Sequence, residues 1–467
     1  MQVLRLGIRF CVLMILTGVV AAPAAAQDFR GTITGRVLDQ SGGALPGTTV
    51  TATHLATNVP SSTTTNDEGQ YTILYLPPGM YRVTAELSGF KKLSRENIEV
   101  RVGDRLSLDL TLDVGQMEET VSVTAESPLL ELASASAGQV IDEKRIALLP
   151  LSDGNPFQLA RMVPGVSFVG DLKFARPFDN GGTSDIRADG AVGGNEFSLD
   201  GSPNMASGRR VAFVPPAGAV QEFKVKTASF DAADGHTAGA MVDVTLKSGT
   251  NALKGEGYYY LRDDKLSETD FFLKRAGTPK PELSYERFGG HAGGPLRSNR
   301  TFVFGAIEWL FDEFPEPGTR TVPTERMRNG DFSELLAVGT QLYDPLTARQ
   351  VGARVVRDPF PGNLIPAGRI SPIAREILKY YPLPNQAGTL NNGLQNNYIS
   401  PNPRTDDFYS LSLRADHNFT DKQRMFVRYT RNDRQEARGH FFGEVNGVIP
   451  VGNYLFRIND GITVDHV

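Results

Sequence analysis

The chain has 467 residues, 22% of them charged, and a formal net charge of −5. This balance lacks the basic footprint of a nucleic-acid-binding protein, so we expect no nucleic-acid partner. The 48 glycines, with β-branched and aromatic residues between turn sequences, favour a mainly β protein of several domains. After residue 26 no run approaches the ~20 consecutive apolar residues of a membrane-spanning helix.

Residues 1–26 have the features of a secretory signal peptide. Arg5 and Arg9 give a positive start, an apolar run follows from 10 to 20, and three alanines at 24–26 fit the A-x-A cleavage pattern. The alternative is a membrane anchor, but the run is too short to span a bilayer. Because the one cysteine is Cys11, we expect an exported mature chain without a disulfide or a cysteine-ligated metal.

Residues 27–114 contain short alternating segments separated by turns. Leucines at every second position from 106 to 112 predict one half-buried strand, and apolar residues at 81, 83, 85 and 87 predict another. Asn-Asp-Glu-Gly at 66–69 and Pro-Pro-Gly at 77–79 are turn sequences. This spacing predicts a small β-sandwich.

Four segments of this region carry a resemblance. They are Gly-Arg-Val at 35–37, Gly-Thr-Thr-Val at 47–50, Thr-Asn-Asp-Glu-Gly-Gln-Tyr at 65–71 and Leu-Pro-Pro-Gly-Met-Tyr at 76–81. Their order resembles the carboxypeptidase regulatory-like domain. That resemblance implies a transthyretin-like fold, which is often grouped with the carbohydrate-binding-like folds.

Two features of this domain have alternative interpretations. Asp67 and Glu68 suit either a calcium site or a hairpin turn with Gly69 at a positive φ. We favour the turn, because no further oxygen ligand is near in sequence. Tyr71, Tyr75 and Tyr81 suit either stacking on sugars or the sheet itself, and we favour the sheet, because aromatic residues are common in strands.

Residues 115–130 form a predicted linker with one β-prone segment. It consists of Glu119, Thr120, Val121, Ser122, Val123, Thr124 and Ala125. The segment resembles the TonB box, which implies a TonB-type energy transducer as a partner. A short exposed strand can add to the edge of a partner's sheet. The alternative is that Val121 and Val123 belong to a last strand of the sandwich.

Residues 131–253 differ in character. A polar stretch at 134–150 and the segment 157–163 favour short helices. Ordered motifs follow, and their characteristic residues are Ile186, Arg187, Gly190, Asn195, Asp200 and Gly201. This order resembles the plug domain of TonB-dependent receptors, with departures at Ala188, Ala240 and Asp243, and it implies an α/β plug.

Residues 254–467 show the pattern of a membrane β-barrel. Candidate strands are 254–262, 284–293, 300–311, 406–419, 423–432 and 456–467. In the clearest one, Tyr409 and Leu411 begin an apolar face, while Ser410, Ser412 and Arg414 lie on a polar face, as lipid and lumen demand. Glu308 and Arg428 are acceptable lumen residues. Long and short connections alternate, as they do between the two sides of outer-membrane barrels.

The 94-residue connection 312–405 resembles that of Oar-like receptors, and 370–378 favours a short helix within it. A transporter of this kind has ~22 strands. At ~10 residues per strand, these need ~220 residues before any loops, so we expect an incomplete barrel and a truncated chain or fragment. The expected fold is a mainly β chain: the sandwich, the plug and the first strands of a transmembrane β-barrel.

The resemblance implies a receptor in the bacterial outer membrane, with a periplasmic N-terminal domain and lipid around its barrel. It would take up an extracellular ligand, such as a siderophore, an oligosaccharide or a peptide, with energy from TonB and without a cofactor. The alternative is an adhesin or a glycan-binding surface protein. We expect no enzyme, because the six histidines form no zinc-peptidase motif and neither G-x-S-x-G nor a P-loop occurs.

Overall fold

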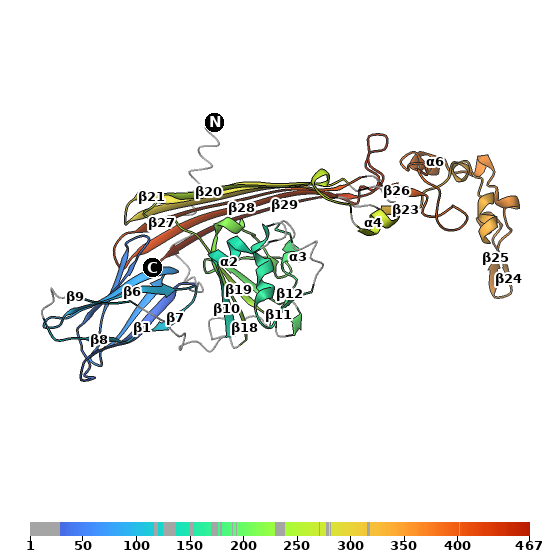
Figure 1. The fold of residues 1–467 in the computed structure, drawn as a ribbon. Helices are drawn as coiled ribbons and strands as arrows, with labels where there is room; N and C mark the ends of the chain where they lie inside the picture. The colour runs from blue at the N-terminus through green and yellow to red at the C-terminus, as the bar shows by residue number, and fades with distance from the viewer. Residues whose placement is uncertain are drawn as a thin grey trace, which may run out of the picture.

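The computed structural model is a mainly β protein whose sheets belong to three parts (Figure 1). The structure describes residues 29–115, 120–124, 137–149, 151, 154–169, 176–177, 180–188, 190–192, 194–228, 239–269, 271–276, 280, 282–314, 318–400 and 402–467. The predicted signal peptide, Glu119 and Ala125 lie outside these residues.

The first part is a sandwich of two sheets, as the alternating pattern predicts. Its strands are β1 (Gly31–Asp39), β2 (Thr49–His54), β3 (Pro60–Thr64), β4 (Gln70–Leu76), β5 (Gly79–Glu86), β6 (Lys92–Val100), β7 (Arg105–Ser107), β8 (Leu110–Leu112) and β9 (Thr120–Thr124). One sheet has the order β3-β2-β5-β6-β9, and the other has β4-β1-β7 with β8 also on β1. Side chains such as Ile33, Val50 and Val83 fill the core between them.

The predicted strand 106–112 is interrupted, although all four of its leucines are buried as expected. β7 and β8 both pair in parallel with β1, and between them the Leu108 N–H still donates to the Thr34 carbonyl at 2.8 Å. Two bonds that involve side chains interrupt the regular ladder there. The Arg36 N–H donates to the Asp109 carboxylate at 2.8 Å, and the Tyr71 hydroxyl donates to the Leu108 carbonyl at 2.6 Å. The alternation of the leucines therefore predicted the buried face, while the bonds to Arg36 and Tyr71, which are distant in the chain, interrupt the strand.

The second part, the middle domain (residues 137–246), has a five-stranded sheet in the order β10-β18-β19-β14-β15. Its strands are β10 (Ala137–Asp142), β14 (Glu196–Leu199), β15 (Ser202–Pro203), β18 (Val220–Ala228) and β19 (Met241–Leu246). A smaller sheet contains β11 (Val166–Phe168), β12 (Ile186–Ala188) and β13 (Ala191–Val192), and β16 (Met205–Ala206) pairs with β17 (Arg210–Val211). The short helices are α2 (Glu143–Leu148), η2 (Pro156–Met162), α3 (Asn180–Thr183) and η4 (Ala217–Ala219).

The helical expectation for 134–150 is wrong in its first half. Residues 137–142 form β10, because they pair antiparallel with β18, and this tertiary contact outweighs local preference. Helix α2 begins only after Asp142, whose carboxylate accepts the Arg145 N–H at 2.8 Å as an N-cap. The predicted helix at 157–163 is present as the 3-10 helix η2.

The third part is a six-stranded antiparallel sheet that matches all six predicted strands. They are β20 (Lys254–Asp263), β21 (Ser284–Arg297), β22 (Thr301–Phe314), β27 (Arg404–Asn418), β28 (Arg424–Arg438) and β29 (Asn453–His466), in chain order across the sheet. Long and short connections alternate as predicted. In the described part of the chain β20 does not pair with β29, so the barrel is not closed.

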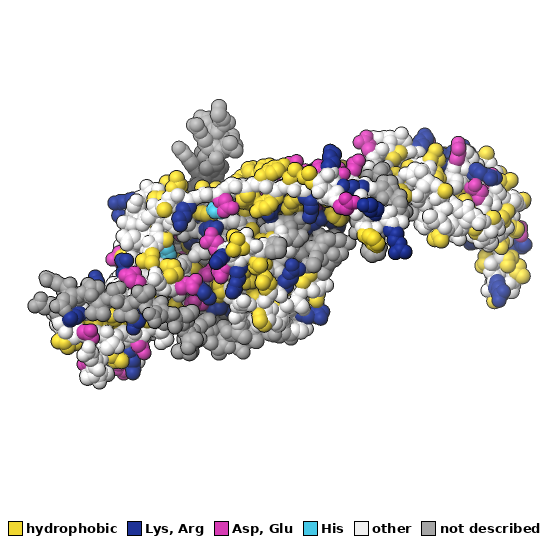
Figure 2. Space-filling view, viewed as in Figure 1, with side chains coloured by type: hydrophobic (Ala, Val, Ile, Leu, Met, Phe, Trp, Pro, Cys, Tyr) yellow, Lys and Arg dark blue, Asp and Glu magenta, His cyan; other side chains and the backbone are white. Residues whose placement is uncertain are grey.

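The two faces of this sheet differ. Ser410, Ser412 and Arg414 are buried towards the middle domain, whereas Leu413 is exposed on the other face. Hydrophobic side chains gather along the sheet in the space-filling view (Figure 2). The exposed apolar residues of its strands include Tyr259, Phe456, Ile458, Ile462 and Val464. This distribution suits lipid outside and a polar interior. None of the helices in the described ranges is long and apolar enough to cross a membrane.

The longest connection, between β22 and β27, folds into a lobe (residues 318–400) beyond one end of the sheet (Figure 1). Its elements are β23 (Gly318–Arg320), α5 (Glu325–Arg328), η6 (Ser333–Val338), η7 (Pro345–Thr347), β24 (Arg349–Val351), β25 (Arg354–Val356), η8 (Pro361–Asn363), η9 (Ala367–Arg369), α6 (Pro372–Leu378) and β26 (Tyr398–Ser400). Helix α6 confirms the helix predicted at 370–378. The connection between β20 and β21 carries η5 (Asp264–Leu266) and α4 (Phe271–Ala276).

Candidate functional site

The middle domain is clamped to the inner face of the six-stranded sheet through Asp200. This residue follows β14 with a φ of +46°, and Gly201 continues the tight turn at +73°. Its Oδ2 lies 2.5 Å from Nη1 of Arg428 on β28, and its Oδ1 lies 3.2 Å from Nη1 of Arg414 on β27. The carboxylate also accepts the Leu246 N–H at 3.0 Å, so it joins β14, β19 and the barrel wall.

The two arginines have further partners that hold them in place. Arg428 donates to the Leu199 carbonyl at 2.9 Å and to the Thr463 hydroxyl at 2.8 Å. Arg414 binds Asp416 through Nε and Nη2, and its guanidinium lies 4.3 Å from the centre of the Phe426 ring. All of the Asp200 side chain is buried, so removing it would leave two buried cations with fewer counter-charges.

A second contact between these parts uses neutral polar groups. The Val214 N–H donates to Oδ1 of Asn432 at 3.0 Å, and the Ser410 hydroxyl donates to the Val214 carbonyl at 3.3 Å. Nδ2 of Asn432 donates to the Ser410 hydroxyl at 2.9 Å, which closes the group. Sequence reasoning missed this contact, although Ser410 was on the predicted polar face.

The remaining motif residues act inside the middle domain. Asn195 donates from Nδ2 to the Ile186 carbonyl at 2.8 Å and accepts the Ala240 N–H at 2.9 Å, so it ties β12 to the start of β19. Arg187 belongs to β12, and Gly190 has a φ of +82° in the turn before β13. The structure therefore brings Asn195 and Ile186 together, and Asp200 and Gly201 together, as two separate groups.

The predicted docking segment pairs with the sandwich. Residues Thr120–Thr124 form β9, whose backbone lies parallel to β6 with Val121 opposite Leu93 and Ser122 opposite Ser94. This is the arrangement of the alternative interpretation, in which the segment is a last strand of the sandwich. The strand is at the end of its sheet, next to β6 alone among the described strands.

The sandwich is itself docked on the other two parts. The Val102 N–H donates to Oε1 of Glu222 on β18 at 2.5 Å, and Nζ of Lys224 lies 3.5 Å from Asp104. Burial, followed by the nearby negative charge of Asp104, raises the pKa of Glu222 to about 7. At the sheet, Arg30 pairs with Asp465 at 3.0 Å.

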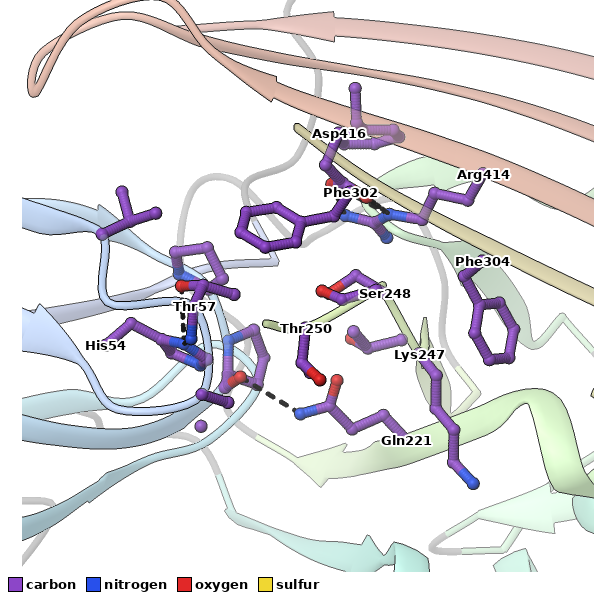
Figure 3. A pocket seen from close by; sticks show the side chains of 18 of the residues that line it. His54, Thr57, Gln221, Lys247, Ser248, Thr250, Phe302, Phe304, Arg414 and Asp416 are labelled. Carbon is purple, nitrogen blue, oxygen red and sulfur yellow. Dashed lines mark hydrogen bonds and ion pairs between the residues drawn. The ribbon is translucent and has the colours of Figure 1, made fainter. Parts of the chain in front are cut away.

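A cavity of about 620 Å³ lies where the three parts meet (Figure 3). Its sandwich side includes His54, and Phe302, Phe304, Arg414 and Asp416 come from the barrel wall. The Thr57 N–H donates to Nδ1 of His54 at 3.2 Å, so the ring proton is on Nε2. Burial lowers the pKa of His54 to about 4, which keeps the ring neutral at pH 7.

The middle-domain side of this cavity is polar. Lys247, Ser248 and Thr250 follow β19 there, and Gln221 donates to the Pro78 carbonyl at 3.1 Å across the gap to the sandwich. Lys247 pairs with Glu143 at 2.7 Å, and Arg414 pairs with Asp416, so these cations have their counter-charges within the protein.

The structure places the residues behind the two alternative interpretations of the sandwich. Asp67 and Glu68 lie in an exposed turn, with Gly69 at a φ of +72°. Tyr71 and Tyr81 are core residues whose hydroxyls donate to the Leu108 and Pro77 carbonyls. Tyr75 is exposed, and the Arg30 guanidinium lies 5.0 Å from its ring centre. No cluster of three or more metal-ligating side chains occurs among the residues that the structure covers.

Comparisons with known proteins agree with this architecture. Residues 32–113 match the carboxypeptidase regulatory-like domain family, and residues 245–466 match the outer membrane beta barrel domain family. The TonB-dependent transporter Oar of Myxococcus xanthus is 25% identical over 334 residues, which are 67% of this chain and 30% of that transporter. The chain thus spans about 30% of the length of this relative.

Two solved structures show more distant likenesses. The ferric enterobactin receptor of Pseudomonas aeruginosa, in a mutant form, has 14% identity and a TM-score of 0.39 over 70% of this chain and 38% of that one. The outer membrane transporter YddB of Escherichia coli has 11% identity and a TM-score of 0.41 over 70% and 36%. The chain is a homologue of the TonB-dependent transporter Oar, and it has an outer membrane beta barrel domain and an N-terminal carboxypeptidase regulatory-like domain.

Proposed function

We propose that the protein is a TonB-dependent receptor that takes up an extracellular ligand through a plugged β-barrel. In this proposal residues 131–253 are the plug, residues 254–467 are the N-terminal part of the barrel, and the sandwich at 27–114 is periplasmic. Residues 119–125 contact TonB, and residues 1–26 direct export. The energy comes from the TonB-type transducer, so the protein needs no cofactor and catalyses no reaction.

The observation that carries the proposal is the clamp between Asp200, Arg414 and Arg428. A plug must be a folded body that is held inside a barrel yet can be released by force. A few buried ion pairs suit this task, because their strength depends on geometry and falls steeply when one partner moves. Asn432 and Ser410 add neutral hydrogen bonds at the same wall.

The lobe and the alternating connections support the direction of transport. If the middle domain enters the barrel from the periplasm, the long connections, including residues 318–400, face outwards. Ligand contacts in proteins concentrate on such loops, which a rigid scaffold positions. The ligand is then a siderophore, an oligosaccharide or a peptide that these loops and the middle domain meet first.

The test uses a peptide of residues 115–135 and a purified periplasmic C-terminal domain of TonB. We expect the peptide to bind and the Val121→Pro peptide to lose binding, because proline removes a backbone donor that strand addition needs. Val121→Thr is the matched control, since it keeps both the N–H and the β-branched shape.

The alternative to be distinguished is an adhesin built on the same barrel. If neither the peptide nor the full chain binds under conditions where a known receptor peptide binds, coupling to TonB is refuted and the adhesin is favoured. Binding that Val121→Pro abolishes and Val121→Thr retains supports the transporter.

A further inference from the structure

The inference concerns the free edge of β9 and rests on the proposed function. β9 ends the sheet β3-β2-β5-β6-β9, and its residues Thr120–Thr124 pair with Lys92–Glu96 of β6 in parallel. In a parallel ladder, the backbone groups of an edge strand that do not face its neighbour point outwards. Half of the hydrogen-bonding groups of β9 are therefore directed away from the sandwich.

The sequence of β9 lacks two features that protect many edge strands. Its sequence, Thr-Val-Ser-Val-Thr, is β-branched apart from Ser122, and it contains no charge and no proline. The opposite edge of the same sheet, β3, begins with Pro60, which cannot donate a ladder bond. Among the described residues, the sheet thus has a proline in one edge strand and neither a proline nor a charge in the other.

The sandwich also contacts both of the other parts, so a pull on β9 has a path into them. It contacts the middle domain through Val102 and Glu222, and it contacts the six-stranded sheet through Arg30 and Asp465. Arg424 of β28 adds a hydrogen bond to the Ser61 hydroxyl at 2.9 Å. β9 lies on the part of the sandwich furthest from the lobe (Figure 1).

We propose that TonB adds its edge strand to the outer edge of β9 while β9 stays paired with β6. The five-stranded sheet would then continue into the partner, and the pull would pass first into the sandwich and from there to the middle domain and the barrel rim. The competing arrangement is that β9 must leave β6 before TonB can bind it.

A disulfide between β6 and β9 separates these arrangements. Ser94 lies opposite Ser122, and neighbouring strands have Cα separations that a disulfide tolerates. We would introduce Ser94→Cys and Ser122→Cys in the full chain on a Cys11→Ser background. The matched control pairs the same Ser94→Cys with Thr84→Cys on β5, which is opposite Ser94 on its other side and leaves β9 unlocked.

The measurement is the Kd for the TonB C-terminal domain, with each variant in detergent micelles, oxidised and then reduced. We expect oxidation of the Ser94→Cys and Ser122→Cys variant to change its Kd by less than about twofold, as in the control. A loss of tenfold or more that reduction restores would overturn the proposal, because it would show that β9 must be released. Failure of the cysteines to form a disulfide would also overturn it, since β9 would then not rest on β6.

Binding of the 115–135 peptide distinguishes a failure of this inference from a failure of the proposed function. If the peptide binds TonB and the oxidised Ser94→Cys and Ser122→Cys variant does not, only the claim that β9 stays paired with β6 is wrong. If neither the peptide nor any full-chain variant binds, coupling to TonB itself is wrong.

Discussion

Oδ2 of Asp200 lies 2.5 Å from Nη1 of Arg428, a residue 228 positions later in the chain. This contact joins the turn after β14 to the barrel wall, and Arg414 reaches the same carboxylate. Buried pairs of this kind are costly to break from one side only, since the remaining charge loses its partner in a dry environment.

Asp200→Asn should loosen the middle domain from the sheet. The amide can still accept the Leu246 N–H, but it no longer balances the two guanidinium groups. We expect a loss of about 3–5 kcal/mol, the usual range for removing one partner of a buried pair. The measurement is hydrogen exchange of the Leu246 amide in the full chain in micelles. Asp460→Asn, which breaks an exposed pair with Arg431, is the control and should change little. Equal exchange in both variants would contradict the clamp.

The docking of the sandwich should depend on pH through Glu222. Its pKa of about 7 in the docked state is above the usual value of 4.5, so the docked state binds the extra proton. Docking is therefore strongest below about pH 4.5 and weakens as pH rises through about 7, by at most about 3 kcal/mol. The measurement is protection of the Val102 amide between pH 5 and pH 8, corrected for intrinsic exchange.

Glu222→Gln separates this carboxyl from other groups in the interface. The amide oxygen still accepts the Val102 N–H, so docking should persist while its pH dependence flattens. Glu86→Gln, at an exposed pair with Lys92, should leave the pH dependence unchanged. A slope of the same sign that survives Glu222→Gln would assign it to another group of the interface. His54 could not be that group, because its lowered pKa acts with the opposite sign and its contribution is lost as pH falls.

The lobe should unfold separately from the barrel when the side chain of Asn363 is removed. Asn363 is fully buried, with a φ of +59°, and it binds the Thr340 carbonyl, the Leu342 N–H and the Gln341 side chain. Asn363→Ala loses these bonds and strains the backbone, at a cost of about 3 kcal/mol. We expect faster tryptic cleavage at Arg375 and Lys379, with the six-stranded sheet intact by circular dichroism.

Asn391→Ala is the control for this prediction, because Asn391 has a similar φ of +53° but is exposed. If both variants are cleaved at the same rate, the hydrogen bonds of Asn363 do not hold the lobe together.

The sequence predicted those features that depend on neighbours in the chain. The alternation of apolar and polar residues located all six barrel strands. It also placed Ser410, Ser412, Arg414, Glu308 and Arg428 on the inner face. It could not pair Arg428 with Asp200, because that partner depends on how the middle domain meets the sheet. The break at Leu108 and the strand at 137–142 were missed for the same reason, since they depend on Tyr71, Arg36 and β18, which are distant in the chain.

The most direct test of the account is binding of the full chain, in outer-membrane-like micelles, to the TonB C-terminal domain. We predict that the wild type and Val121→Thr bind with similar Kd values, that Val121→Pro weakens binding at least tenfold, and that the 115–135 peptide competes with the wild type. Equal binding of Val121→Pro and Val121→Thr would contradict the account, because TonB would then engage the protein at a place other than β9.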